Sequence, residues 1–196
     1  MNVNRLKLVG SISPSIGNLT FLREVNFSYN RLVGSIAKEL GHLRRLRSLV
    51  LDFNHLQGKI PEELSNCSNL QMIGLRANNL TGDIPFALGD MKNLIELHLP
   101  YNYLIGGIPS SLGNLSSLNV LSLSRNNLEG IIPNALGIIP SLQVFEIGPN
   151  GFSGSVSDNL GNLKNLLSLN IENSHLGSEK VGDLNLLSSL SNCSLL

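Results

Sequence analysis

The chain has 196 residues, 42% of them apolar, and its 14 basic side chains balance its 14 acidic ones. A chain of this length can bury a core of its own, and its zero net charge argues against a protein that binds nucleic acid through a basic surface. No stretch reaches the roughly 18 consecutive apolar residues of a membrane-spanning helix, and the amino-terminal MNVNRLKLVG lacks the apolar core of a signal peptide.

A period of 24 residues runs through the chain from its first residues. At the amino terminus Met1 and Val3 already keep the phase of the pattern, although Leu6 stands where an asparagine is expected. Asparagine then recurs at this spacing without slippage, and glycine follows each asparagine four residues later. The asparagines are Asn30, Asn54, Asn78, Asn102, Asn126 and Asn150. Stacked units of this length bury leucines that a single unit cannot bury, so the pattern predicts a solenoid with a continuous core.

Each repeat, called a rung below, is expected to contain the same local features. In the rung Leu46 to Asn69, LRSLVLDFNHLQGKIPEELSNCSN, the Leu-x-Leu pair predicts a short strand with one face in the core, and successive strands form a parallel sheet. The asparagine after the strand is expected to bond backbone groups of its own and the neighbouring rung, which makes a structural ladder. The glycine supplies a backbone conformation that other residues resist, and the Ile-Pro pair predicts an extended segment that closes the rung.

The motif LxGxIPxxLGxL, present at Leu80 to Met91 and at Leu104 to Leu115, resembles the plant-specific class of leucine-rich repeats. The resemblance covers nearly the whole chain. It implies an α/β solenoid, shaped as a horseshoe or superhelix, with a parallel sheet of short strands on its concave face and 3-10 turns on its convex side. We therefore expect residues 1–196 to be a single array of about seven full repeats with partial ends, in which residues 174–196 form a longer, irregular repeat.

Two segments are similar to a narrower group. LVGSISPSIGNLTFL at Leu8 to Leu22, and the irregular segment His175 to Leu196, resemble ectodomains of the plant receptor-like kinase subfamily that includes the bacterial flagellin and elongation-factor receptors. In that subfamily an outer repeat array binds a peptide or a co-receptor and an inner serine/threonine kinase signals, mainly in immunity. The resemblance implies a ligand-recognition segment at the extracellular face of the plasma membrane, part of a type I membrane receptor.

The sequence contains neither the signal peptide, cysteine-bearing cap and transmembrane helix nor the kinase that this subfamily leads one to expect. The chain is therefore interpreted as a fragment or truncated product of a longer receptor. Two alternatives remain at this stage. One is a stand-alone secreted inhibitor that resembles the polygalacturonase-inhibiting proteins, and the other is a truncated decoy that does not signal.

The outward positions of the strands are the expected place for a peptide or protein ligand. Aromatic and arginine side chains there are the types that anchor protein interfaces. The candidates on the concave face are Tyr29, Asp52, Phe53, Arg76, His98, Tyr101, Tyr103 and Arg125. Tyr29, Phe53 and Tyr101 share one column of the repeat. Pro100, which also is expected to face outward, cannot donate a backbone hydrogen bond and predicts the end of regular strand pairing.

One column of the repeat bears on whether the chain could be an enzyme with a serine, histidine and carboxylate relay. His98, Ser122 and Glu146 occupy the same position on consecutive rungs, about 5 Å apart. A relay needs the histidine between the other two residues, whereas here the serine is central. We therefore expect no catalysis by this chain, and no metal or other cofactor.

Asparagines in Asn-x-Ser/Thr sequons are candidates for glycosylation. They are Asn18, Asn66, Asn79, Asn114 and Asn192. A sixth, Asn26, is doubtful because a glycan there would occupy the concave face. Cys67 falls on an inward position that leucine holds in other rungs, so it is expected to be a buried apolar residue. Cys193 lies about five rungs away, roughly 24 Å, so the two cysteines are not expected to form a disulfide.

Overall fold

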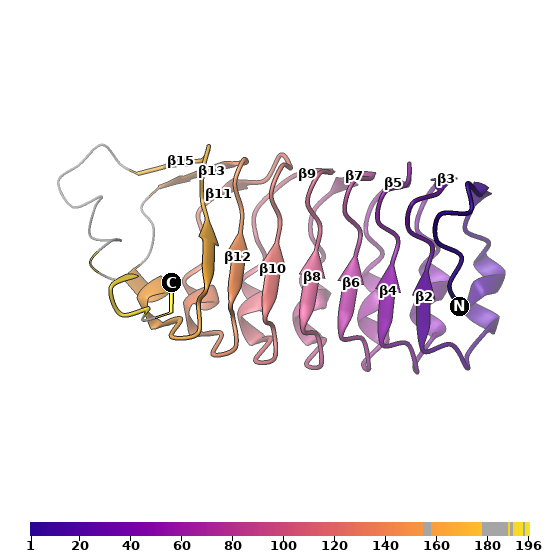
Figure 1. Ribbon diagram of the computed structural model, residues 1–196, viewed down its shortest axis with the longest axis horizontal. Coiled ribbons are helices and arrows are strands. Elements are labelled where there is room, and N and C mark those ends of the chain that lie inside the picture. The colour runs from indigo at the N-terminus through magenta and orange to yellow at the C-terminus, as the bar shows by residue number, and fades with distance from the viewer. Residues whose placement is uncertain (155–157, 178–187, 189, 194) are drawn as a thin grey trace.

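The structure is a computed structural model that describes residues 1–154, 158–177, 188, 190–193 and 195–196. These residues form a solenoid in which the rungs lie side by side from the amino-terminal end to the carboxyl-terminal end (Figure 1). Most of the irregular repeat expected over residues 174–196 lies outside the described residues, so its course is not discussed further.

The first strand of each rung joins one parallel sheet of seven strands, called the main sheet below. Its strands are β2 (Glu24–Asn26), β4 (Ser48–Val50), β6 (Met72–Gly74), β8 (Glu96–His98), β10 (Val120–Ser122), β12 (Val144–Glu146) and β14 (Ser168–Asn170), adjacent in that order. The register follows the period of the sequence, because Leu97 pairs with Ile73 on one side and with Leu121 on the other. The predicted parallel sheet is confirmed.

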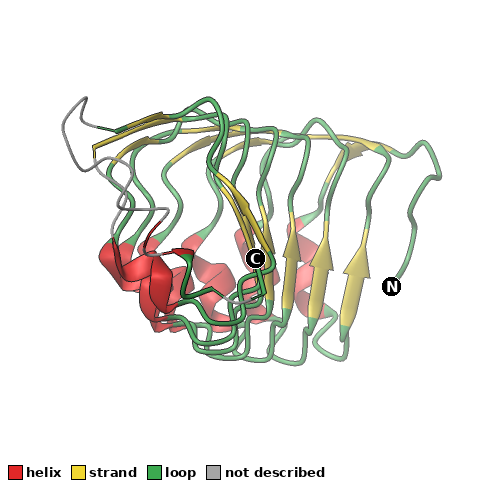
Figure 2. Ribbon diagram, turned by 60° about the vertical axis from the view of Figure 1, so that its left-hand side comes forward, coloured by secondary structure: helices red, strands yellow, loops and turns green. Residues whose placement is uncertain are grey.

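A second set of short strands, which the sequence analysis did not predict, lies beyond the asparagine of each rung. It comprises β1 (Val9–Ser11), β3 (Arg31–Val33), β5 (Gln57–Gly58), β7 (Asn79–Gly82), β9 (Tyr103–Leu104), β11 (Glu129–Gly130), β13 (Gly151–Gly154) and β15 (His175–Leu176), paired as β1-β3, β5-β7-β9 and β11-β13-β15. We call these strands the lateral sheets. Figure 2 shows them across the top of the rungs, between the main sheet and the helices.

Short 3-10 helices form the side of each rung opposite the main sheet (Figure 2). They are η1 (Pro14–Asn18), η2 (Lys38–His42), η3 (Glu62–Asn66), η4 (Phe86–Asp90), η5 (Ser110–Asn114), η6 (Asn134–Ile138) and η7 (Asp158–Asn162). The proline of the Ile-Pro pair precedes the helix in extended backbone, as at Pro109 with φ −60° and ψ 129°. Glycine lets neighbouring helices approach closely, because a Cβ on Gly113 would lie 2.4 Å from the carbonyl oxygen of Ala135.

The core is a stack of leucine and isoleucine side chains, most of them fully buried, that runs the length of the array. The repeated asparagines close it where the main-sheet strands end. At Asn102 the side-chain Nδ2 donates to the carbonyl oxygens of Leu75 and Leu99, and Oδ1 accepts from the backbone N–H of Leu80. The amide therefore joins two rungs. Among the described residues, no buried side-chain nitrogen or oxygen lacks a hydrogen-bond partner.

The two cysteines lie where the repeat pattern places them. Cys67 is fully buried, its Sγ donates to the carbonyl oxygen of Leu40, and burial raises the pKa of its thiol to about 11. Cys193 is also buried, and both thiols are free. The expectation of a buried, unpaired Cys67 is confirmed.

Candidate ligand-binding surface

The chain leaves strands β2, β4, β6, β8 and β10 through a residue in the left-handed backbone conformation, placed directly before the ladder asparagine. The φ angles are between 52° and 59° at Tyr29, Phe53, Ala77, Tyr101 and Arg125. Residues other than glycine seldom adopt this conformation, so the surrounding hydrogen bonds must hold it. At Tyr101 the backbone N–H donates to the carbonyl oxygen of Ser124, and the adjacent Asn102 side chain is bonded on both sides.

Because these turns stack in register, their side chains form a continuous row of rings and guanidinium groups. The rings of Tyr29 and Phe53 stack with centroids 4.4 Å apart at an interplanar angle of 15°. Arg5 lies 4.7 Å from the Tyr29 centroid. Arg76 lies 5.4 Å from the centroids of both Phe53 and Tyr101. Arg125 completes the series 5.2 Å from the Tyr101 centroid, and we call this series the cation–π row.

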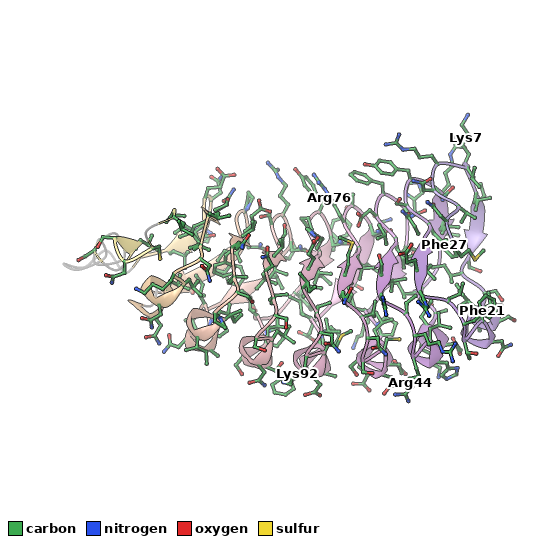
Figure 3. All side chains as sticks on the ribbon, turned by 60° about the horizontal axis from the view of Figure 1, so that its bottom comes forward. Lys7, Phe21, Phe27, Arg44, Arg76 and Lys92 are labelled. Atoms are coloured by element: carbon green, nitrogen blue, oxygen red, sulfur yellow. The ribbon has the colours of Figure 1, made fainter. Side chains whose placement is uncertain are left out.

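Two arginines extend the cation–π row beyond its aromatic rings: Arg76 in the middle and Arg5 at the amino-terminal end. Ala77 occupies the ring position of the third rung and would leave a gap, and the guanidinium of the preceding residue, Arg76, fills it. Figure 3 shows the side chain of Arg76 projecting from the ribbon. Arg5 was not among the sequence-based candidates. It lies one 24-residue period before Tyr29, so the period itself was the signal that could have identified it.

A groove with a volume of about 460 Å³ opens over the carboxyl-terminal half of the main sheet. Four of the predicted candidates line it: Arg76, His98, Tyr101 and Arg125. Strands β10 and β12 contribute Ser122 and Glu146 to the same lining, and Glu172 lies at its carboxyl-terminal side. The groove therefore presents two guanidinium groups from the cation–π row together with carboxylates from the later rungs.

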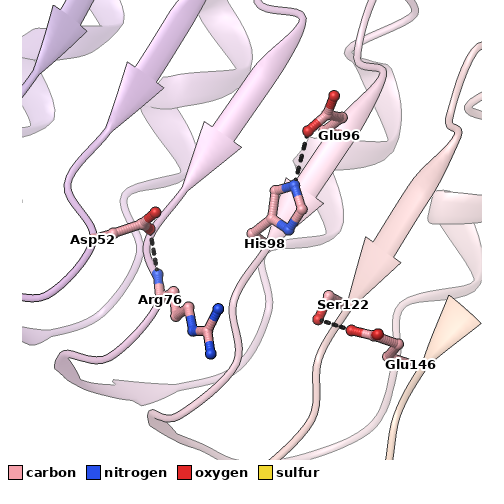
Figure 4. A network of polar contacts seen from close by, with 6 residues as sticks. All are labelled: Asp52, Arg76, Glu96, His98, Ser122 and Glu146. Atoms are coloured by element: carbon pink, nitrogen blue, oxygen red, sulfur yellow. Dashed lines mark hydrogen bonds and ion pairs between the residues drawn. The ribbon is translucent and has the colours of Figure 1, made fainter. Parts of the chain in front are cut away.

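The polar side chains on the main sheet form separate pairs (Figure 4). Nε2 of His98 lies 2.9 Å from Oε2 of Glu96, two residues earlier on the same strand. Ser122 Oγ donates to Oε2 of Glu146 at 2.7 Å. Because His98 and Ser122 bond to different carboxylates, no serine–histidine relay forms among the described residues. In that part of the chain, no group of three histidines, cysteines or carboxylates is placed to hold a metal ion.

The carboxyl group of Asp52, which follows strand β4, has a shifted pKa. Burial raises its pKa above the ordinary value of 3.8, although the N–H of Arg76 and the charges of His98 and Arg76 oppose the shift. The Arg76 backbone N–H donates to Oδ1 at 2.8 Å. The carboxylate lies over Gly74, where a Cβ would be 3.0 Å from Oδ1. The absent side chain of Gly74 is what makes room for Asp52.

The raised pKa of Asp52 predicts a change in the pH dependence of stability. Below its ordinary pKa the carboxyl is protonated in both states, and as the pH rises through the higher folded pKa it must ionise where burial disfavours the charge, so stability falls. In Asp52→Asn this loss is absent, while the amide oxygen can still accept from Arg76. Relative to wild type, the variant should gain in free energy of unfolding as the pH rises above the ordinary pKa of 3.8, measured by urea denaturation. Parallel profiles for the two proteins would contradict this expectation.

One sequence-based placement in the fourth rung is wrong and another is consistent with the structure. Pro100 has little exposed area but lines the groove, in keeping with its predicted outward position, and β8 ends before it as expected. Tyr103 lies in β9, beyond Asn102, so it belongs to a lateral sheet and not to the main sheet. The chain changes direction at the left-handed Tyr101, so Tyr103, two residues later, lies beyond the face of the main sheet.

The candidate glycosylation sites are all exposed. Asn18, Asn66 and Asn114 end helices η1, η3 and η5, on the side away from the main sheet. Asn79 begins β7 in a lateral sheet. Asn26, in contrast, lies half-buried in β2, and its Oδ1 accepts from the hydroxyl group of Ser28.

The sequence profile described as Leucine Rich Repeat matches residues 21–43, 45–67, 93–115 and 117–138. The solved BIR3–SERK2 complex from Arabidopsis thaliana contains a chain that is 33% identical, with a TM-score of 0.61; the match covers 68% of this chain and 71% of that chain. The chain belongs to the leucine-rich repeat family. A comparison with curated proteins found no match.

Two plant receptors match these leucine-rich repeats over more of the chain. The ectodomain of the plant membrane receptor kinase GASSHO1/SCHENGEN3 from Arabidopsis thaliana, solved in complex with CASPARIAN STRIP INTEGRITY FACTOR 2, is 40% identical over 87% of the chain, with a TM-score of 0.85. The plant peptide hormone receptor RGFR1, solved in complex with RGF2, is 34% identical over 98%, with a TM-score of 0.92. The chain spans 20% and 30% of the length of these two proteins.

Proposed function

We propose that this leucine-rich repeat chain is a ligand-recognition segment of the ectodomain of a plant receptor-like kinase, and that it binds an extended peptide along the groove of the main sheet. The observation that carries the proposal is the cation–π row beside that groove, because it places aromatic and arginine side chains along one edge of the sheet. The proposal includes a position at the extracellular face of the plasma membrane and a role in immune signalling. Within the described residues, no helix is both long enough and apolar enough to cross a bilayer.

The dimensions of the main sheet suit an extended peptide. Neighbouring strands lie about 4.8 Å apart, so seven strands span roughly 30 Å, which matches about nine or ten extended residues. The side chains on this surface are already fixed by hydrogen bonds and ring contacts, as at Ser122 and Tyr101. A fixed surface loses little conformational entropy on binding, which favours affinity for a flexible ligand.

Similarity to solved receptors supports the same function. GASSHO1/SCHENGEN3 and RGFR1 were each solved with a bound partner, and RGFR1 is a peptide hormone receptor. Both share at least a third of their aligned residues with this chain. The absence of a relay at His98 and Ser122 fits binding rather than catalysis as the role of the groove.

Replacing Tyr101 by alanine should weaken peptide binding by about tenfold, because a buried aromatic anchor at an interface contributes more than 1 kcal/mol. The backbone should be unaffected, since Ala77 has the same left-handed conformation in the preceding rung. A random dodecapeptide library, displayed between two constant segments, would supply the probes. Dissociation constants of the selected peptides would then be measured by fluorescence anisotropy.

Tyr103→Ala is the matched control for that measurement. Both tyrosines are about half exposed, at 46% and 56%, but Tyr103 lies in the lateral β9. Affinity for the selected peptides should therefore stay within about twofold of wild type in this variant. Peptides that bind Tyr101→Ala as tightly as wild type would overturn the groove as the binding surface.

A further inference from the structure

Each ring of the cation–π row contacts a guanidinium group or a ring of a neighbouring rung. Tyr29 lies between Arg5 and Phe53, and Phe53 lies between Tyr29 and Arg76. Tyr101 carries a guanidinium from the rung on each side. Neighbouring rungs supply these groups, so a ligand in the groove meets guanidinium groups beside the ring of Tyr101.

The two guanidinium groups that flank Tyr101 are unpaired within the described residues. Neither Arg76 nor Arg125 donates a side-chain hydrogen bond or forms an ion pair there, and the carboxylate nearest to Arg76 in the network of Figure 4, that of Asp52, accepts from the backbone N–H instead. Each guanidinium carries five N–H donors. Both arginines are exposed and both line the groove, so their free donors are available to a ligand lying in it.

We propose that Arg76 and Arg125 together bind the side-chain carboxylate of an aspartate or glutamate within the bound peptide. This inference rests on the proposed function and specifies the ligand: a peptide with an internal acidic residue. Guanidinium groups bind carboxylates through paired, charge-assisted hydrogen bonds. Tyr101 acts as a positioning residue, because its ring holds both guanidinium groups at 5.4 and 5.2 Å from its centroid.

The rest of the groove favours an internal acidic residue over a terminal carboxylate. Beyond Arg125 the lining continues through Glu146, Asn170 and Glu172, so the peptide chain passes the arginines instead of ending at them. The carboxylates of Glu146 and Glu172 would repel a second negative group at that end, whereas over β6 to β10 the charges of Arg76 and Arg125 offset those of Asp52 and Glu96. The carboxylate of the ligand is therefore placed over β6 to β10, where Arg76 and Arg125 can reach it.

The test uses peptides selected by the full chain from the dodecapeptide library, whose constant flanking segments leave no free carboxyl terminus. The best binder would be compared with a version in which its acidic residue is changed to the amide, against wild type, Arg76→Gln and Arg125→Gln. Arg45→Gln is the matched control, because Arg45 is exposed after η2, outside the groove lining. We expect amide substitution in the peptide, or either glutamine variant, to weaken binding about tenfold, and the combination to add little further.

Three outcomes would overturn the inference. The first is a set of groove-dependent binders without any acidic residue, and the second is unchanged affinity in both glutamine variants. The third is equal weakening by Arg45→Gln, which would indicate general charge attraction. If Tyr101→Ala still weakens binding in these cases, the proposed function stands and only the carboxylate assignment fails. If variants of Tyr101, Arg76 and Arg125 all bind the peptides as tightly as wild type, both the proposed function and the carboxylate assignment fail.

Discussion

Asn102→Ala should lower the free energy of unfolding by about 3 kcal/mol, because it leaves one buried backbone N–H without an acceptor and removes one of two donors from two buried carbonyl groups. The N–H of Leu80 loses its acceptor. The carbonyl oxygens of Leu75 and Leu99 each lose one of two donors, and they keep Nδ2 of Asn78 and of Asn126 respectively. Each unsatisfied buried group costs about 1 to 3 kcal/mol. Asn102 is 6% exposed, so water reaches these groups poorly. Urea denaturation followed by circular dichroism would measure the loss.

Asn127→Ala is the matched control for the ladder. Asn127 is exposed, and its side chain makes no hydrogen bond among the described residues, so its removal should change the free energy of unfolding by no more than about 0.5 kcal/mol. The comparison removes the same amide group from a buried and an exposed position. A loss of less than about 1 kcal/mol in Asn102→Ala would mean that water satisfies the freed groups, and the ladder would then be dispensable.

The ladder also explains why the variant is expected to destabilise more than one rung. Asn102 belongs to the fourth rung, but two of its partners, Leu75 and Leu80, belong to the third. Solenoid stability is approximately a sum of rung and interface terms, and this amide contributes to an interface. Loss of the bond therefore weakens the junction between β6 and β8, which holds Arg76 and His98 beside the groove.

The solenoid could be predicted because the same sequence pattern recurs in successive rungs. Asn102, Leu104 and Ile108 recur in phase with other rungs, and a period of 24 residues leaves one arrangement that buries them all. The lateral sheets were not predictable in the same way. Their strands are two to four residues long and pair through backbone groups, so no side-chain alternation marks them. For that reason Tyr103 was assigned to the wrong sheet.

The groove was predictable in its residue types but not in its contacts. Column positions placed Tyr29, Phe53 and Tyr101 together, since residues 24 apart stack in register. That Arg76 fills the gap at Ala77 depends on the length of an arginine side chain and on the left-handed turn, which a sequence column does not record. The backbone geometry at the end of the strand therefore determines these side-chain contacts, which the 24-residue period alone does not predict.

Phe145→Ala should lower the free energy of unfolding by about 4 kcal/mol, because it removes a large, fully buried ring and leaves a cavity. Phe145 is the central residue of β12, where it pairs with Leu121 and Leu169. The rungs on either side can collapse only slightly, since close approaches such as that of Gly113 to the next helix already fix their spacing. The loss would be measured by urea denaturation.

Phe145→Leu is the control that separates cavity formation from simple change of side chain. Leucine occupies the equivalent position in the neighbouring rungs, at Leu121 and Leu97, so this variant should lose only about 1 kcal/mol. The position also affects the groove, because β12 carries Val144 and Glu146 in its lining. Phe145→Ala should therefore weaken binding of the selected peptides as well, whereas Phe145→Leu should not. Equal loss of stability in the two variants would show that ring shape, rather than buried volume, holds β12 in place.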